Sequence, residues 1–408
     1  MENNHIYNPI SLVSDMWGSN IGNILQEIAN SSQILGYELF IVGGTVRDLI
    51  LGKNIKDLDI SVNGNAITLA KTINDTLGIP AKYHERFLTA TLFLNNLEID
   101  LVSARSETYP KPGSLPSITL SNIDEDLKRR DFSINALAIP LNSPHQIIDP
   151  TGGIDDIYSE SIRVLHSKSF IDDPTRIFRL IKYAARFDFG IEDSTLLFLE
   201  EAISNNVINT ISKDRLTHEL NLIFTEINIE KCINMLLEYR VLGLKSSLKP
   251  RELNLNLNDL HTAWASFLLV FDMSDYQSFT SLFKFDKSLL NTLNEVIELE
   301  RAKPNLLVSN VHCKTIVPIY RILKNISRES IVIYRNTCNN QALSDNLDKY
   351  LLYTDNTVLD LMPSDLINLG VPKNHISFFL ELLTESKLSC SVLTKQDEID
   401  LVVQYMNE

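Results

Sequence analysis

The chain has 408 residues, of which 44% are hydrophobic and 22% charged, so its composition is that of a folded globular protein and excludes a fibrous one. It carries 37 Lys and Arg against 52 Asp and Glu, and this net charge of -15 argues against a generally basic nucleic-acid-binding surface. No apolar run approaches the roughly 18 residues that a membrane span needs, so we expect no membrane partner.

The cysteines and the first residues indicate the compartment. The four cysteines are scattered, with no CxxC or CxxH pair, and "MENNHIYNPIS" has neither the basic nor the apolar segment of a signal peptide. We therefore expect a cytoplasmic protein with reduced thiols and without a zinc site.

The negative charge is unevenly distributed along the chain. Residues 161–190 carry six basic and three acidic side chains, and residues 301–350 carry eight basic and three acidic ones. Two zones thus remain available for a polyanion, whose phosphates need only charge and shape for contact. The alternative for the second zone is an ordinary charged helical surface.

The predicted elements change character along the chain. A polar lead-in precedes an amphipathic helix candidate at 21–36, and helical stretches such as 66–78 then alternate with β-rich runs up to about residue 165. The runs predict strands at 37–42, 58–62, 90–94, 97–103 and 145–150. From about 170 onward, apolar residues recur at three- and four-residue spacing. We therefore expect an α+β fold, with a small mixed-sheet head followed by an all-helical remainder.

Acidic residues alternate with apolar ones on two of the predicted strands. In "DLDI", Asp57 and Asp59 point to one face of a strand while the apolar residues point to the other, and "LEIDL" repeats this with Glu98 and Asp100. If the two strands are neighbours, three or four carboxylates converge, and their repulsion is relieved by a divalent cation such as Mg²⁺. A lone DxD at a solvated strand edge is the alternative.

A glycine pair follows the strand at 37–42. In "FIVGGTVRDLILG", Gly43 and Gly44 allow a ligand close to the backbone, and Arg47 lies in the first turn of the helix that follows, where it can reach a phosphate. The pattern matches neither GxGxxG nor GxxxxGK[ST], so a Rossmann or P-loop site is not expected.

A basic stripe marks the start of the helical region. Arg176, Arg179, Lys182 and Arg186 are spaced three, three and four residues apart, so they share one helix face. The preceding "DDP" is also an ordinary helix start, and a basic stripe is usually a solvated face. Asp and Arg side by side can, however, match the donors and acceptors of cytosine or adenine.

These segments together resemble a known family. "GGTVRD", "DLD", "RRDFSINALA" (129–138), "DPTGGIDD" (149–156) and "DDPTRIFRLIKYAARF" (172–187) occur in the order seen in class II tRNA nucleotidyltransferases and bacterial poly(A) polymerases. The likeness covers about residues 38–225. It implies a polymerase-β-like head at 1–165, a helical neck with a nucleotide-selecting motif at 166–245, and a body and tail at 246–408 that contact tRNA.

The resemblance also implies roles for individual residues in the head. Asp57 and Asp59 look like the catalytic pair that binds Mg²⁺, and Asp100, or else Glu98, is a candidate third carboxylate. Gly44, with its neighbour Gly43, and Arg47 look like the triphosphate contacts.

Further roles fall on the arginine motif and the neck. Arg130 resembles the nucleotide-contacting arginine of the family, Asp173 and Arg176 would hydrogen-bond the Watson–Crick edge of the incoming base, and Arg179 would be a further nucleotide contact. At Lys182 the family often has arginine, so a cation is kept but the bidentate fork is lost.

The activity implied is template-independent addition of C and/or A from CTP or ATP to the 3′ end of tRNA. Pyrophosphate would leave after an in-line attack assisted by two metal ions. A poly(A) polymerase of the same fold and an inactive RNA-binding protein remain as alternatives. Whether the product is CCA, CC or A depends on the segment 106–126, which we expect to be a mobile loop.

Overall fold

The structure is a computed structural model and describes most of the chain. The described residues are 8–55, 57–94, 97–141, 146–243, 259–271, 273–307 and 316–407. Two compact units, Met1–Gly243 and Leu244–Glu408, divide the chain and are taken separately below. The boundary predicted at 165/166 lies inside the first unit, so the division into head, neck and body stays a prediction.

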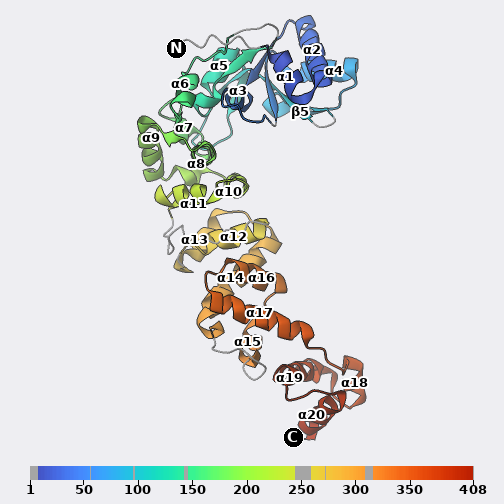
Figure 1. The fold of residues 1–408 in the computed structure, drawn as a ribbon. Helices are drawn as coiled ribbons and strands as arrows, with labels where there is room; N and C mark the ends of the chain where they lie inside the picture. Colours follow the sequence, from blue (N-terminus) through green and yellow to red (C-terminus); the bar gives the residue numbers. More distant parts are fainter. Residues whose placement is uncertain are drawn as a thin grey trace. The chain divides into compact units, whose positions relative to one another are not determined.

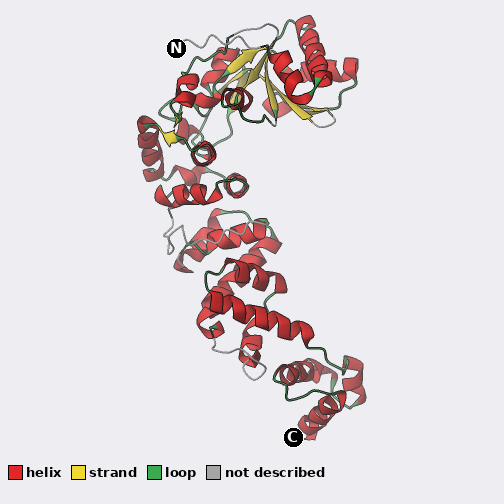
Figure 2. Ribbon diagram, in the orientation of Figure 1, coloured by secondary structure: helices red, strands yellow, loops and turns green. Residues whose placement is uncertain are grey.

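A six-stranded mixed sheet forms the centre of the first unit (Figure 2). Its strands in spatial order are β3 (Ala81–His84), β4 (Thr89–Leu94), β5 (Leu97–Ser103), β2 (Leu58–Asn63), β1 (Glu38–Val42) and β8 (Ala138–Pro140). Only β2 and β5 run parallel, and the other neighbours are antiparallel. The rest of the described chain is mostly helical, so the predicted α+β fold is confirmed.

Helices cover the apolar face of this sheet. Leu58 and Ile60 of β2 and Ile99 of β5 are at most 1% exposed, as their alternation with acidic residues predicts. The helix α4 (Ala66–Leu77) packs against β4 and β5, and α2 (Ser19–Ile34) packs against α4 (Figure 1). Burial of these side chains fixes which face of β2 and β5 is left for the acidic residues.

The strand predicted at 145–150 is wrong. Residue 145 lies outside the described residues, and within 146–150 only Ile148 makes an isolated bridge, to Ala138. The carboxylate of Asp149 accepts hydrogen bonds from the backbone N–H groups of Thr151, Gly153 and Ile154. These bonds turn the chain into a helix instead of extending it.

The polar lead-in also contains a helix that sequence periodicity misses. The side chain of Asn8 accepts from the N–H of Ser11, and Pro9 occupies the first turn of α1 (Pro9–Trp17). Helix α1 packs closely on α2, because a Cβ at Gly22 would lie 1.8 Å from the Ser14 Oγ. The remaining helices of the first unit are α3 (Gly44–Ile50), α5 (Ile123–Lys128), α6 (Gly153–Tyr158), α7 (Ser169–Asp172), α8 (Thr175–Phe187), α9 (Asp193–Ser204), α10 (Lys213–Phe224) and α11 (Ile229–Glu238).

Helices make up the described part of the second unit. They are α12 (Leu260–Leu268), α13 (Tyr276–Leu282), α14 (Lys287–Leu306), α15 (Ile316–Leu323), α16 (Arg328–Thr337), α17 (Gln341–Asn356), α18 (Pro363–Asn368), α19 (Ile376–Leu388) and α20 (Lys395–Asn407). Trp264 is fully buried and packs edge-on against Phe279 and Phe283. No helix in the described stretches is long and apolar enough to cross a bilayer.

Ion pairs within the second unit engage much of its basic zone. Arg321 pairs with Glu385, Arg328 with Asp355, and Arg335 with Asp348, while Lys303 and Lys324 also have carboxylate partners. The zone predicted to contact RNA is therefore partly neutralised by its own unit, and the RNA contact stays a prediction.

A buried carboxylate organises the last three helices. Glu398 of α20 is fully buried, and its oxygens accept from the backbone N–H groups of Asp360, at 3.0 Å, and Leu361, at 2.7 Å. The ammonium group of Lys387 lies 2.8 Å from the same carboxylate. These bonds tie the segment before α18 to α19 and α20.

Glu398→Ala should therefore destabilise the three-helix tail. Two backbone donors and an ammonium group would lose a buried acceptor, which costs about 2–4 kcal/mol and predicts roughly 30- to 700-fold faster amide exchange. Hydrogen exchange of peptides from 358–407 measures this. The control Glu381→Ala removes an exposed ion pair with Lys324 and should have a much smaller effect. Equal exchange rates in the two variants would contradict the assigned role of Glu398.

Candidate active site

The carboxylates of "DLDI" and "LEIDL" lie on neighbouring strands. Asp59 of β2 stands directly opposite Asp100 of the parallel strand β5, and Asp57 immediately precedes β2. Asp57 and Asp100 are exposed, and Asp59 is half-buried. The strands are thus neighbours, as the prediction required, and they pair Asp59 with Asp100; the convergence of three or four carboxylates stays a prediction, and Glu98 is exposed.

Two threonines that the sequence analysis did not single out hold this group. The hydroxyl of Thr45 in α3 donates to the carbonyl of Asp57 at 3.1 Å and lies 3.4 Å from the N–H of Asp59. The hydroxyl of Thr91 in β4 donates to the Asp100 carboxylate at 2.7 Å. Thr45 ties the glycine turn to the carboxylate strand. The position of Thr45 directly after the glycine pair in "GGTVRD" is the feature of the sequence that could have identified it.

Burial and like charges act together on Asp59. Burial, together with the charges of Asp100 and Asp57, raises the pKa of its carboxyl from 3.8 to about 6, although the charges of Arg130 and Arg47 lower it. A cation bound beside Asp59 would offset both the burial of its charge and the repulsion from Asp100 and Asp57. The Asp59 carboxyl group can therefore hold either a proton or a cation.

The donor set fits a divalent cation with few protein ligands. Among the residues that the structure describes, no three His, Cys, Asp or Glu side chains are grouped so as to surround one metal ion. Mg²⁺ commonly takes one or two carboxylates and completes its shell with water and substrate phosphate. Asp57 and Asp59 can supply such a pair, and the part played by Asp100 stays a prediction.

The glycine turn makes room for Arg130. Gly43 has φ 68° and ψ -129°, and a Cβ there would lie 2.6 Å from the Nη1 of Arg130. Arg130 donates to the carboxylate of Asp126 at 3.0 Å and to the carbonyl of Asn135 at 3.3 Å. Its buried Nε has no hydrogen-bond partner in the described chain, so one donor is left for a ligand.

Arg47 is more enclosed than the sequence suggests. It is 4% exposed, donates from Nη1 to the Asn135 side chain at 2.5 Å and from Nε to Asp48 at 2.9 Å, and lies 4.6 Å from the centre of the Phe187 ring. Gly44 adjoins its guanidinium, since a Cβ there would lie 3.3 Å from Nη2. The phosphate contact predicted for Gly44 and Arg47 stays a prediction.

A chain of polar contacts continues into the helical region. Asn135 donates to the buried Asp131 carboxylate at 3.1 Å, and the guanidinium of Arg179 lies 2.7 Å from the same carboxylate. Burial by itself would raise the pKa of Asp131, but Arg179 and the donated hydrogen bonds hold it below its usual value. The charge of Asp131 in turn raises the pKa of Arg179. Arg179 is thereby fixed at the start of α8.

The two residues predicted to read the base already have protein partners. One oxygen of Asp173 accepts from Arg215 of α10 at 2.8 Å and from the hydroxyl of Thr175 at 2.8 Å. Arg176 is 5% exposed and donates to the hydroxyl of Ser169 at 2.7 Å and to the carbonyl of Arg129 at 2.9 Å. Their base-reading role stays a prediction, and Arg215 is an addition to the cluster.

The basic stripe of α8 is only partly solvated, because Arg176 and Lys182 are buried while the side chains of Arg179 and Arg186 are 43% and 42% exposed. Arg186 pairs with Glu226. The ammonium group of Lys182 lies 3.8 Å from a carboxylate oxygen of Glu219 in α10. The sequence analysis missed Glu219, because the stretch "SKDRLTHELNLIF" (212–224) that contains it gives this residue no signal of its own.

The segment 106–126 contains an antiparallel ribbon of β6 (Arg105–Thr108) and β7 (Ser117–Leu120). Its Gly113 donates to the carbonyl of Asp172 at 3.2 Å and accepts from Arg215 at 2.8 Å. A Cβ at Gly113 would lie 2.3 Å from the Thr210 Oγ1. The loop between the two strands thus contacts Asp172 at the end of α7 and Arg215 of α10, and the predicted mobility of the segment stays a prediction.

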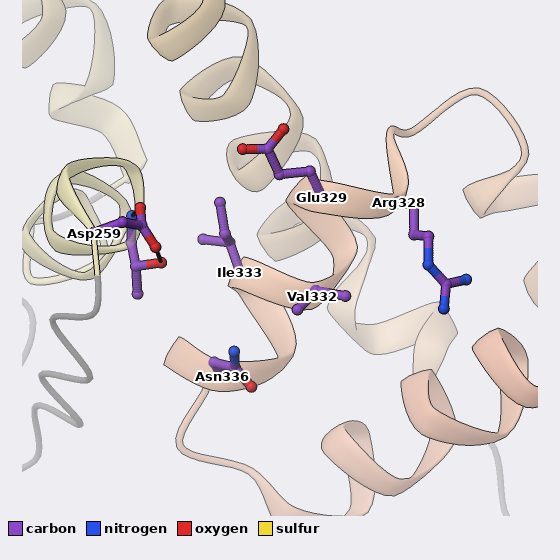
Figure 3. Close-up of a pocket in the computed structure, with 7 residues that line it drawn as sticks. Asp259, Arg328, Glu329, Val332, Ile333 and Asn336 are labelled. Carbon is purple, nitrogen blue, oxygen red and sulfur yellow. Dashed lines mark hydrogen bonds between the residues drawn. The ribbon is translucent and has the colours of Figure 1, made fainter.

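A separate cavity of about 510 Å³ lies in the second unit (Figure 3). It is lined by Asp259, Thr262, Arg328, Glu329, Val332, Ile333 and Asn336. The carboxylate of Asp259 accepts from the N–H and hydroxyl of Thr262, so it caps α12. The cavity shares no residue with the carboxylate cluster of the first unit.

Known proteins are similar to this chain over the residues that form the six-stranded sheet. Residues 39–163 match the family model of the Poly A polymerase head domain. An A-adding tRNA nucleotidyltransferase of Halalkalibacterium halodurans is 42% identical over 231 residues, which are 55% of this chain and 54% of that protein. The chain spans about half the length of the first relatives that it matches.

Solved structures match along nearly the whole chain. An apo form of a CCA-adding enzyme has a TM-score of 0.81 at 28% identity and covers 98% of this chain and 100% of its own. The Thermotoga maritima CCA-adding enzyme complexed with tRNA has a TM-score of 0.73 at 28% identity, with the same coverage of both chains. Nucleotidyltransferases of this kind generally use a divalent metal ion.

Because the pKa of Asp59 is raised, the increase in stability that a bound cation gives should depend on pH. The folded state keeps the Asp59 proton up to about pH 6 and the unfolded chain only to about 3.8, so the metal-free protein loses stability as pH rises through this window. Mn²⁺ competes with that proton. It should therefore raise Tm more at about pH 7.5 than at about pH 5.5.

Thermal unfolding of wild type and Asp59→Asn with and without Mn²⁺ measures this effect. The variant cannot lose a proton at this position, so the difference between the two pH values should be smaller. Equal stabilisation of the wild type at both pH values would refute the link between Asp59 and the cation.

Proposed function

We propose that this homologue of the tRNA nucleotidyltransferases, which carries their Poly A polymerase head domain at residues 39–163, adds A, C or both to the 3′ end of tRNA. ATP or CTP would be the substrate and pyrophosphate the by-product. The observation that carries the proposal is the placement of Asp59 opposite Asp100, with Asp57 just before the same strand and bonded to Thr45, which follows the turn of Gly43 and Gly44.

Asp57 and Asp59 would hold Mg²⁺ on the polar face of the sheet. When bound, the cation supplies charge neutralisation for the triphosphate and lowers the pKa of the attacking 3′-hydroxyl. Thr45 keeps the backbone of both aspartates next to the glycine turn, and Thr91 orients the Asp100 carboxylate toward the same face. The chain thus positions its donors before any substrate arrives.

The nucleotide would lie between the sheet and the helices that follow it. The spare Nε donor of Arg130 suits a phosphate oxygen, with Gly44 and Arg47 close to the same turn. Asp173 and Arg176 would face the base, with Arg179 and Lys182 contributing positive charge behind them. Asp173 still has a second carboxylate oxygen for a base amino group.

We favour ATP as a substrate of this chain, because the relative with 42% identity is an A-adding enzyme. Proteins that share 42% and 32% identity with this chain are A-adding enzymes, one at 36% adds CC, and others at 28% are CCA-adding enzymes. We place the activity in the cytoplasm, where tRNA ends are processed, and assign tRNA contact to residues 246–408. A solved relative bound to tRNA covers that region of the chain and supports this assignment.

Extension of defined RNA substrates tests the proposal. Transcripts of one tRNA ending at the discriminator base, at the first C and at the second C are incubated with ATP or CTP and Mg²⁺. We expect A on the transcript ending in CC, and C on the shorter ones only if the enzyme also adds C. Folded protein that extends none of them would refute the proposal. Long A tails on unrelated RNA would favour the poly(A) polymerase alternative.

Removal of one carboxylate tests the metal assignment. Asp57→Ala should lower the rate of extension by about 100-fold or more, because the cation loses a ligand at the reacting phosphate. Asp75→Ala, which removes an exposed carboxylate from α4, is the matched control and should keep wild-type activity. Undiminished activity of Asp57→Ala would remove this residue from the site.

A further inference from the structure

One face of α10 is turned toward Asp173, which is predicted to read the base, and toward Lys182 of α8. Arg215 and Glu219 are four residues apart, so they lie on the same side of α10. Arg215 donates to Asp173 at 2.8 Å, and Glu219 lies 3.8 Å from the ammonium group of Lys182. Glu219 therefore belongs to the same cluster as Asp173, although it comes from another helix.

The carboxylate of Glu219 has an oxygen left over. Its side chain is 13% exposed, and its buried Oε2 has no hydrogen-bond partner among the residues that the structure describes. The distance of 3.8 Å to Lys182 is too long for a hydrogen bond. A buried acceptor that the protein itself leaves unpaired is available to a ligand that carries a donor.

The charges around Glu219 are those of the proposed nucleotide site. Burial outweighs the opposing charges of Lys182, Arg179 and His218, so the pKa of its carboxyl is raised, and the charge of Asp173 acts in the same direction as burial. When it is ionised, the carboxylate only accepts hydrogen bonds. Two carboxylates from different helices, Glu219 and Asp173, thus stand within electrostatic reach of each other.

Cytosine and adenine each carry an exocyclic amino group with two N–H donors. Uracil and guanine present a keto oxygen at the corresponding position, and its lone pairs repel a carboxylate. One oxygen of Asp173 is already occupied by Arg215 and Thr175, so a second carboxylate can accept the second N–H.

We propose that Glu219 is a specificity-determining residue that accepts an N–H from the amino group of the incoming cytosine or adenine and repels the keto oxygen of uracil and guanine. The inference rests on the proposed function, because it places the base of the nucleotide between α8 and α10. It adds a residue outside the helix on which the base-reading motif lies.

Glu219→Gln tests this role, because the amide has the same size and brings a donor that can face a keto oxygen. We expect the preference for ATP and CTP over UTP and GTP to fall by about 10- to 100-fold in the variant. Equilibrium binding of each nucleotide to the full chain in Mg²⁺ measures the preference without RNA, and incorporation into tRNA measures it a second time. Glu219→Ala should lower the preference as well, by weakening ATP and CTP binding.

Glu226→Gln is the matched control, since it removes a carboxylate from an ion pair with Arg186 beside the end of the same helix. Its nucleotide preference should equal that of the wild type. An unchanged preference in both Glu219 variants would overturn the inference and leave Glu219 a structural partner of Lys182. Wild-type protein that binds ATP or CTP selectively but extends no tRNA would refute the proposed function alone, because the binding ratios still test Glu219.

Discussion

Electrostatic repulsion between carboxylates on two neighbouring strands is the constraint around which the first unit is arranged. Asp59 stands opposite Asp100 in the sheet, with Asp57 next to it, and the apolar residues between them are buried on the far face. The strands cannot slip by one residue, because that would bury the acidic side chains. The repulsion is therefore built in, and cations must balance it.

The balancing cations are themselves held by a second set of acids. Arg130 is anchored to the fully buried Asp126, and Arg47 is bonded to Asn135, which in turn donates to Asp131. Asp131 pairs with Arg179 at the beginning of the helical region. A series of polar contacts thus connects Arg47 of the helix after the glycine turn with Arg179 of α8.

Local patterns predicted the strands β1, β2, β4 and β5 and the acidic pair, since a period of two is a property of adjacent residues such as Leu58 and Asp59. The partners of the arginines were not predictable in this way. Asn135 is 88 residues from Arg47, and Arg215 is 42 residues from Asp173. Only the three-dimensional fold brings these groups together. The sequence analysis treated residues such as Arg47 and Asp173 as free to bind a ligand, although each is already bonded to a residue that lies far away in the sequence.

In the second unit as well, the local sequence does not reveal which charged side chains pair with one another. Residues 301–350 are basic in sequence, yet Arg321 finds its carboxylate 64 residues away in α19, and Arg328 finds its own in α17. These pairs are largely exposed, so each contributes little to stability and exchanges its partner readily. RNA phosphates would have to compete with the resident carboxylates for Arg321, Arg328 and Arg335. Binding to this surface therefore depends on how phosphates are spaced as well as on their charge, which suits recognition of a folded RNA by its shape.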